Sequence, residues 1–423
     1  MNNYIINSYK NLSLVQKIEY SALLLLAFLI PISWLWASRA TLLLVVAMVA
    51  KLIVEEKNHI IRKKEPRQKL FLFFCISYIL YAISMIYTSN TDVGLQNLEK
   101  KLSFIVFPLF FLVANLSYLT QNRIHIILYS FVVGLFAFVF INLSWATYDY
   151  IFLNAPIGRF IGWEVTKLAY IHHTYVAMYS CLAIVFCFFK IFEQPNIFNL
   201  KTVLLSIAII FFILFIILVE SRAGILCMGL LFFFLLLWIL IYKKSFRTML
   251  SVGGIVVGVI IISCLVFPSG LNRLIKTQQA LSDSEQKEDI RITLLKAGTN
   301  VAKENWICGV GVGDRCDVLE NYYIENNLDC GTLNSHNQFI DTTISIGVLG
   351  LLALLSYFIL PIVLFIKERK WNFTLLLFLF IIGFNAVFEA VFESQTGIIF
   401  FNFIYCILFF YSFVQKMEDD TAR

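Results

Sequence analysis

Ionisable side chains stand at the ends of strongly apolar runs, and these positions are where chemistry is expected. Arg222 lies in the short run Glu220–Gly224 between two apolar stretches. A guanidinium fork at this depth is suited to bidentate binding of a phosphate, although it could also contact lipid headgroups or pair with Glu220. Arg291 lies on a segment with helical spacing, where it is either a second anion ligand or a solvated surface charge.

A histidine precedes a later apolar run. His336 and Asn337 occur together in the sequence Asn334–Phe339, just before that run begins. An imidazole is the natural general base near pH 7, and at the boundary between water and lipid it could deprotonate an acceptor hydroxyl. A lone histidine can equally be structural, so spacing alone leaves both roles open.

Two further positions are candidates for substrate binding. Lys101, with Lys100 beside it, precedes an apolar run and is either a headgroup anchor or an aid to anion binding. Glu389 falls at helical spacing with Asn385 and Glu393 near the end of another run. These three side chains could share one helix face, where they would pair with an arginine or hydrate the helix terminus.

Other familiar chemistries do not fit the sequence. The glycines of the run 309–313 follow an expected helix rather than a strand, which excludes a dinucleotide loop. No metal site and no cofactor are expected, because no His/Cys spacing typical of zinc occurs. Cys316 and Cys330 could form a disulfide that closes a loop of about 15 residues, worth about 3 kcal/mol, but the sequence leaves this bond open.

The composition indicates a helical membrane protein. Of 423 residues 60% are hydrophobic and 14% charged, whereas soluble domains contain about 45–50% and about 25%. Continuously apolar runs exclude an alternating β-barrel pattern, and the net charge of +6 is too dispersed to favour nucleic acid. We expect an all-α polytopic fold with about 12 transmembrane helices. They span 21–37, 40–54, 70–88, 102–119, 124–146, 174–192, 202–219, 223–242, 248–267, 340–366, 373–391 and 396–414.

Three successive segments follow from this pattern. Residues 1–267 contain nine expected spans, 268–339 form a long partly helical loop, and 340–423 contain three spans and a tail. Ser282 and Glu285 make a capping box before an expected helix at 283–305. Its apolar face consists of residues at helical spacing, namely Ile290, Leu294, Ala297 and Val301.

The positive-inside rule sets the expected orientation. With the N-terminus in the cytoplasm, the cytoplasmic segments contain twenty of the 33 Lys and Arg residues. Most of the remainder lie in the loop 268–339, which is long enough to escape the rule. Both termini are therefore expected in the cytoplasm and the long loop outside.

Several of these motifs together resemble the O-antigen ligase/polymerase superfamily of bacterial envelope glycosyltransferases. They are Ser221–Gly224 at the start of a span, Arg291 followed by Trp306 and the glycine run, and Asn334–Phe339 entering a span that continues Ile346–Gly350. The specific motifs lie within 220–350, while the topology of the whole chain is similar.

The resemblance implies a GT-C-like, metal-independent glycosyltransferase of the bacterial inner membrane with a periplasmic loop. An undecaprenyl diphosphate-linked glycan would be the donor, and lipid A–core or another glycan the acceptor. Arg222 and Arg291 would hold the diphosphate and His336 would activate the acceptor hydroxyl. We infer that Asn337 orients His336 or a sugar.

Two kinds of enzyme in this superfamily, ligases and polymerases, share these motifs. A ligase passes the finished polysaccharide to lipid A–core, and a polymerase extends the lipid-linked glycan. The compact chain, with one large outer loop in the C-terminal half of the sequence, favours the ligase. A lipid-linked oligosaccharide flippase is a third possibility, but such transporters tend to have polar sites at the midplane and repeated halves, which this sequence lacks.

Overall fold

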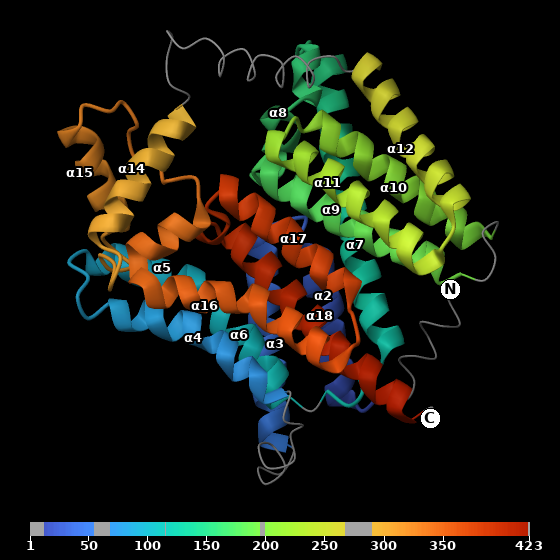
Figure 1. Cartoon of the computed structure of the whole chain (residues 1–423), viewed down its shortest axis with the longest axis horizontal. Coiled ribbons are helices and arrows are strands. Elements are labelled where there is room, and N and C mark those ends of the chain that lie inside the picture. Colours follow the sequence, from blue (N-terminus) through green and yellow to red (C-terminus); the bar gives the residue numbers. More distant parts are fainter. Residues whose placement is uncertain (1–11, 55–67, 115, 195–198, 267–289, 422–423) are drawn as a thin grey trace. The chain divides into compact units, whose positions relative to one another are not determined.

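The computed structural model describes residues 12–54, 68–114, 116–194, 199–266 and 290–421, and these residues form helices without any strand (Figure 1). The all-helical prediction is therefore confirmed for them. The α-helices are α2 (Leu14–Leu29), α3 (Trp34–Val54), α4 (Phe71–Ser84), α5 (Thr91–Lys101), α6 (Ser103–Val113), α7 (Gln121–Phe152), α8 (Trp163–Thr166), α9 (His173–Phe192), α10 (Leu200–Leu218), α11 (Arg222–Trp238), α12 (Phe246–Val266), α14 (Ile290–Glu304), α15 (Arg315–Glu325), α16 (Gln338–Glu368), α17 (Phe373–Phe388) and α18 (Gln395–Thr421). Short helical turns are η2 (Gln68–Leu70), η3 (Ile157–Phe160), η4 (Lys167–Ala169), η5 (Ile239–Lys243) and η6 (Val391–Glu393).

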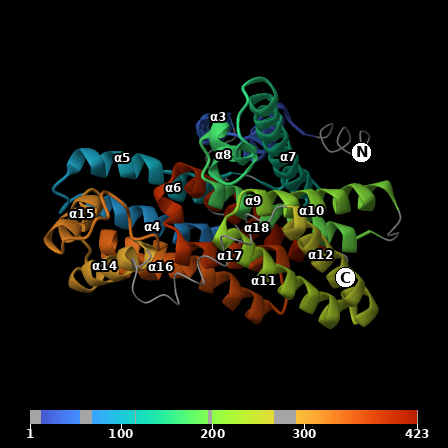
Figure 2. The ribbon, with the colours of Figure 1, turned by 90° about the horizontal axis from the view of Figure 1, so that it is seen from above.

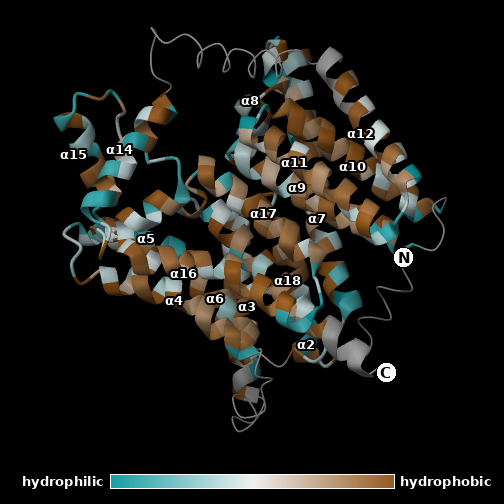
Figure 3. Cartoon of the chain, in the orientation of Figure 1, coloured by the Kyte–Doolittle hydropathy of each residue, from teal (hydrophilic) through white to brown (hydrophobic). Residues whose placement is uncertain are grey.

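Among the described helices, 7 are long and apolar enough to cross a membrane, and three shorter apolar helices accompany them. Figure 3 shows hydrophobic residues along most helices and more hydrophilic ones on α14 and α15. The prediction of a helical membrane protein is confirmed, but the count of twelve spans and the GT-C-like arrangement are not. One reason is that some apolar runs form short helices: the expected span 102–119 contains the 11-residue helix α6.

The first two spans begin and end elsewhere than expected. The chain turns between α2 and α3 at Ile30–Ser33, whereas the expected spans 21–37 and 40–54 placed the break near residue 38. Pro31 lies in this turn and has no N–H to continue the helix. The N–H groups of Ile32 and Ser33 both bond to the carbonyl of Leu29, which closes the turn.

The chain forms two compact units, each built from separate stretches of sequence. Unit 1 consists of Met1–Gly134, Ile290–Leu376 and Ala386–Arg423, and unit 2 of Leu135–Asp289 and Leu377–Asn385. Each unit is described by itself below.

The core of unit 1 is built on α18, whose apolar stretch is 94% buried because it is apolar on all sides. The ring of Tyr357 stacks on that of Phe74 at 4.9 Å, and the ring of Tyr405 meets Phe74 edge-on at 4.8 Å. The Tyr357 hydroxyl donates to the Phe74 carbonyl and the Tyr405 hydroxyl to the Tyr357 carbonyl. Since lipid is as apolar as these side chains, close packing and satisfied hydroxyls hold the helices together.

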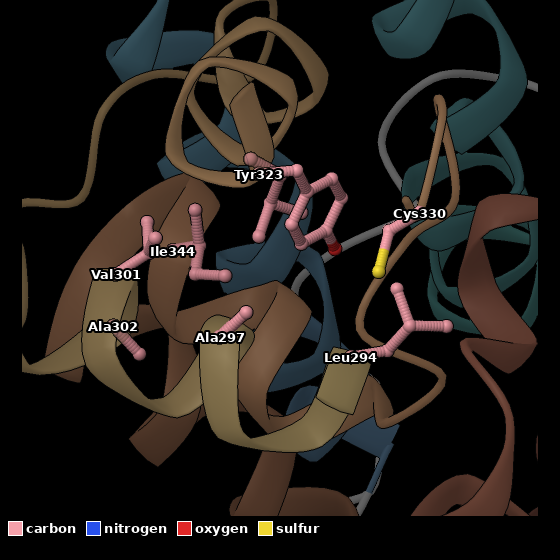
Figure 4. Packing of buried hydrophobic residues seen from close by; sticks show 8 residues of the cluster. Leu294, Ala297, Val301, Ala302, Tyr323, Cys330 and Ile344 are labelled. Atoms are coloured by element: carbon pink, nitrogen blue, oxygen red, sulfur yellow. The ribbon is translucent and has the colours of Figure 1, made fainter. Parts of the chain in front are cut away.

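Two amphipathic helices, α14 and α15, pack on the start of α16 in unit 1 (Figure 2). Their shared core contains Leu294, Ala297 and Val301 from α14, with Tyr323 from α15 and Ile344 from α16 (Figure 4). The expected apolar face of the loop helix is thus confirmed, except that its first member, Ile290, is exposed. The helix is described from 290, so its expected start at 283 and the capping box at 282–285 lie outside the described residues.

The glycine run 309–313 explains a break in α16. Helical geometry is interrupted at Ile346 and Gly347, and there Val310 and Gly311 donate their N–H groups to the carbonyls of α16 residues 344 and 345. Gly347 has φ of +65°, and a Cβ atom on it would lie 2.2 Å from the Ile307 carbonyl oxygen. Close backbone approach therefore requires glycine at position 347, where the run 309–313 packs against α16.

Unit 2 is a bundle in which α9 packs against α10 and α11. A Cβ atom on Gly224 would lie 2.4 Å from the Cβ of Ala177, so glycine brings α11 close to α9. The same stretch contains Ser221, whose hydroxyl oxygen caps α11 by accepting from the N–H of Gly224. This capped turn fixes the start of α11, where Arg222 is the first residue.

Candidate functional site

His336 lies in a strained turn at the entrance to α16. Its φ is +49°, in the left-handed region, which costs a non-glycine residue on the order of 1–3 kcal/mol and persists only where the surroundings hold it. Its N–H donates to the side-chain oxygen of Asn334, and Asn337 caps α16 by accepting from the N–H groups of residues 339 and 340.

The imidazole faces a carboxylate. Nδ1 of His336 lies 3.3 Å from Oε1 of Glu389, and the side chains are 24% and 13% exposed. Helix α17 ends at Phe388, and Glu389 adopts an extended conformation that turns it away from the helix. Within the described residues Nδ1 makes no hydrogen bond, so its contact with Glu389 is electrostatic: the negative carboxylate favours a proton on Nδ1, which leaves Nε2 as the basic atom.

Two amides join the His336 turn to the segment that contains Glu389. The Asn337 side chain donates to the carbonyl of Val387, and the Gln338 side chain accepts from the N–H of Phe392. These bonds bracket Glu389 in the chain. The facing arrangement of imidazole and carboxylate is thus held by the backbone on both sides.

A buried charge cluster lies next to this turn. Nη1 of Arg315 is 2.7 Å from Oδ2 of Asp341, and its Nη2 is 3.0 Å from Oε2 of Glu393. Lys101 donates to Oε1 of Glu393 and to the Phe392 carbonyl, both at 2.9 Å. Two cations and two carboxylates therefore balance one another in a region closed to water.

The electrostatics outside the spans follow from burial and pairing. Burial alone would raise the pKa of Glu393, but the charges of Arg315 and Lys101 bring it below its ordinary value. Burial lowers the pKa of Lys101, and Glu393 opposes this shift. Burial would also lower the pKa of Arg315, yet its carboxylate partners raise it above the ordinary value. Glu393 and Arg315 are accordingly charged at neutral pH.

Arg291 lies near the beginning of α14, on the helix that packs against the His336 turn. A Cβ atom on Gly298 would lie 2.6 Å from the Cβ of Ser335, so α14 touches the residue just before His336. Arg291 precedes Gly298 by seven residues, which puts it on the same helix face about 10 Å further along the axis. Its side chain is exposed.

Arg222 lies in unit 2, whereas Arg291, His336 and Glu389 lie in unit 1. It is partly exposed at the N-terminus of α11 and has no hydrogen bond or ion pair within the described part of the chain. A cation at the positive end of a helix is electrostatically unfavourable unless an anion binds there. The preceding Glu220 adopts φ of +48°, a second strained position.

The remaining predicted binding residues differ in their surroundings. Asn337 and Glu389 border the His336 turn, whereas Lys101 is 2% exposed and directed into the charge cluster. The expectation that Asn385, Glu389 and Glu393 share a helix face is wrong, because α17 ends before Glu389 and Glu393 lies in a separate turn.

The disulfide between Cys316 and Cys330, which the sequence left open, is not formed, since both residues are free thiols. Cys330 is buried in the core between α14 and α15, and the Cys316 sulfur accepts from Arg315 at 3.4 Å. Over the described residues, no group of three His, Cys, Asp or Glu side chains is arranged to bind a metal ion.

Sequence reasoning did not single out Arg315, Asp341 or Ser335. One signal was available: Asp341 is an ionisable residue inside an otherwise apolar run, which by itself suggests a functional position. Its partners could not be identified, because Arg315 and Ser335 are 26 and 6 positions away and only folding brings all three together.

Residues 207–355 match the family model described as O-antigen ligase. This stretch includes Arg222, Arg291, His336 and the glycine run. The search of curated proteins found no match.

Proposed function

We propose that this chain is an O-antigen ligase, a membrane glycosyltransferase, and the match of residues 207–355 to the family model described as O-antigen ligase supports this proposal. The donor is a glycan on undecaprenyl diphosphate, and the acceptor is lipid A–core. The reaction takes place at the periplasmic surface of the bacterial inner membrane, with both termini in the cytoplasm. The proposed orientation in the membrane agrees with the distribution of Lys and Arg along the sequence.

The observation that carries this proposal is the strained His336 turn, with Nδ1 3.3 Å from the Glu389 carboxylate. Nε2 of His336 accepts the proton of the acceptor hydroxyl as its oxygen bonds to the anomeric carbon. The bond from that carbon to the phosphate oxygen breaks, and its electron pair leaves with the diphosphate. A positioned general base typically contributes about 10²–10⁴-fold to the rate.

The leaving diphosphate gains negative charge, which Arg222 and Arg291 stabilise. The position of Arg222 at a helix N-terminus supports its role, since the helix N–H groups and the guanidinium attract the same anion. Arg291 is supported by its location on α14, which packs on Ser335.

Three further residues act around this centre. Glu389 favours the His336 tautomer with the proton on Nδ1, and Asn337, which is buried, fixes the turn that presents His336 to the acceptor sugar. Lys101 acts through Glu393, which it pairs with, rather than by contact with the substrate.

A polymerase that extends the lipid-linked glycan uses the same chemistry with another acceptor. To decide between them, the purified chain in lipid nanodiscs is given undecaprenyl diphosphate-linked glycan with or without lipid A–core. Glycan on lipid A–core supports the ligase, whereas longer lipid-linked chains without core support the polymerase. Movement of the donor across a membrane without transfer would instead indicate a flippase.

The base assignment is tested in the same assay. His336→Ala should reduce transfer by about 10²-fold or more at an unchanged level of protein in the membrane. His125→Ala, which changes a histidine elsewhere in unit 1 that contacts Tyr411, is the control. Normal transfer by the His336→Ala protein would refute the proposal.

A further inference from the structure

We propose that Arg315, Asp341 and Ser335 are positioning residues that hold His336 in its strained conformation against Glu389. The inference rests on the proposed function, since it assigns the origin of the geometry that the general base needs. It concerns residues that do not touch the substrate and act through the turn.

Asp341 is the centre of this set. It is 0% exposed and uses both carboxylate oxygens: Oδ2 pairs with Arg315 at 2.7 Å, and Oδ1 accepts from the Ser335 hydroxyl at 2.8 Å. The Ser335 N–H is a further, longer contact to Oδ1 at 3.4 Å. A carboxylate only accepts hydrogen bonds, so its orientation is set by the donors on either side.

Ser335 links Asp341 to Asn337, the residue that follows His336. Its hydroxyl oxygen accepts from the N–H of Asn337 at 3.3 Å while its proton is directed to Asp341. The residues before and after His336 are therefore tied to each other and to α16. A left-handed conformation that costs on the order of 1–3 kcal/mol can be maintained by this double attachment.

Arg315 connects Asp341 and Ser335 to the segment that contains Glu389, the partner of His336. Its second nitrogen contacts Glu393, four positions after Glu389, and Lys101 holds that carboxylate from the opposite side. One guanidinium thus joins the helix that bears the His336 turn to the segment that bears Glu389.

Stability alone does not explain this cluster. Replacing a buried ion pair with well-packed apolar side chains is often neutral or stabilising, because desolvation offsets the attraction. Directional hydrogen bonds to a carboxylate, in contrast, define a geometry that apolar packing does not. Four buried charges around one turn therefore indicate that orientation is their function.

The test compares two buried serines on either side of Asp341. Ser335→Ala removes the hydroxyl that joins Asp341 to the turn, whereas Ser345→Ala removes a hydroxyl that only bonds to the Asp341 carbonyl within α16. Ser335 and Ser345 are 1% and 2% exposed, so the test variant and its control are matched in burial and in the type of substitution. The full chain in nanodiscs is assayed for glycan transfer, and each variant's unfolding temperature is measured.

We expect Ser335→Ala to lower kcat by about 10- to 100-fold at an unchanged KM for the lipid-linked donor, while Ser345→Ala retains the wild-type kcat. Equal kcat values for the two alanine variants would overturn the inference, and so would a loss in Ser335→Ala that appears only as a raised KM.

If Ser335→Ala unfolds below the assay temperature, Ser335→Cys replaces it, because a thiol preserves the volume and is only a weak donor. A wild-type kcat for that variant would also overturn the inference. Wild type and His336→Ala are assayed alongside. If wild type transfers no glycan, or His336→Ala transfers normally, the proposed function has failed; if only Ser335→Ala behaves like its control, the positioning role alone has failed.

Discussion

At the scale of single residues, the site combines one strained imidazole with carboxylates of different roles. Glu389 is partly open to solvent and faces His336, while Glu393 is held between two cations. Four positions apart, they differ because one follows the end of α17 and the other lies in the turn before α18. A glutamate therefore acts on the general base His336 at position 389, whereas at position 393 it joins the segments that contain Arg315 and Lys101.

Glu389→Gln should lower kcat by about tenfold, less than the loss of the base itself, because an amide still contacts Nδ1 but does not stabilise the imidazolium. The measurement is glycan transfer under saturating donor. Glu368→Gln, a carboxylate at the far end of α16, is a control for loss of charge. Wild-type kcat for Glu389→Gln would contradict a role for this contact.

Glu393 gives the fold a predictable pH dependence. Its folded pKa lies below the ordinary value of 4.5, so its ionised form stabilises the fold at neutral pH. This contribution is present above the unfolded pKa and is lost as the pH falls through the folded pKa. Unfolding temperatures measured from pH 7 to pH 3 should show that Glu393→Gln is less stable than wild type at pH 7 and that the difference narrows below about pH 4.

The exposed Glu99→Gln variant on α5 is the control for this titration. A stability difference between wild type and Glu393→Gln that stays constant over the whole range would show that ionisation of Glu393 does not contribute.

At the scale of helices, glycines set the distances on which the site depends. α14 approaches the His336 turn at Gly298, and the loop after α14 approaches the break of α16 at Gly347. In both places a methyl group would meet atoms closer than 3 Å, which real Cβ contacts do not tolerate. The helices are apolar enough to pack in many ways, and these contacts select one.

Gly298→Ala should push α14 away from Ser335 and lower kcat by about tenfold, although alanine is the better helix former by about 1 kcal/mol. Gly254→Ala on α12 meets nothing within 4 Å and should leave transfer unchanged. Transfer rates and unfolding temperatures of both variants check this expectation. Equal activity of the two would mean that the Gly298 contact has no influence on the site.

Gly347→Ala combines a close contact with φ of +65°, so it should reduce the free energy of unfolding by more than about 1 kcal/mol. Thermal unfolding of the purified protein measures the effect. Gly254→Ala again provides the reference for an added methyl in open space. A Gly347→Ala protein as stable as wild type would show that the break in α16 can relax without cost.

At the scale of the whole molecule, the proposed orientation makes an exposed thiol accessible from one side of the membrane. Cys308 is exposed in the stretch between α14 and α15 that is expected outside. A membrane-impermeant maleimide added to intact spheroplasts should label wild type, and Cys308→Ser should lose most of the label. Lys370→Cys, introduced into Cys308→Ser, should react only after permeabilisation. If Lys370→Cys is labelled in intact spheroplasts and Cys308 only after permeabilisation, the topology is the reverse of the proposed one.

The sequence alone determined the class of protein and the residues that resemble a family. Continuous apolar runs have few alternatives to membrane helices, because an unpaired backbone is costly in lipid. The motifs around Arg222, Arg291 and His336 were likewise recognisable from local order, and residues 207–355, which contain them, match the family model described as O-antigen ligase. The apolar face of α14 was predicted because its period is a local property.

Only the tertiary structure decided which side chains meet. The contact of His336 with Glu389, and of Arg315 with Asp341 and Glu393, joins positions 26 to 78 residues apart. Helical spacing wrongly placed Glu389 and Glu393 on one face, because nothing local shows where α17 ends. Helix ends in such uniformly apolar sequence depend on packing and on prolines or glycines at close contacts, so the site is a product of the assembled helices rather than of any one segment.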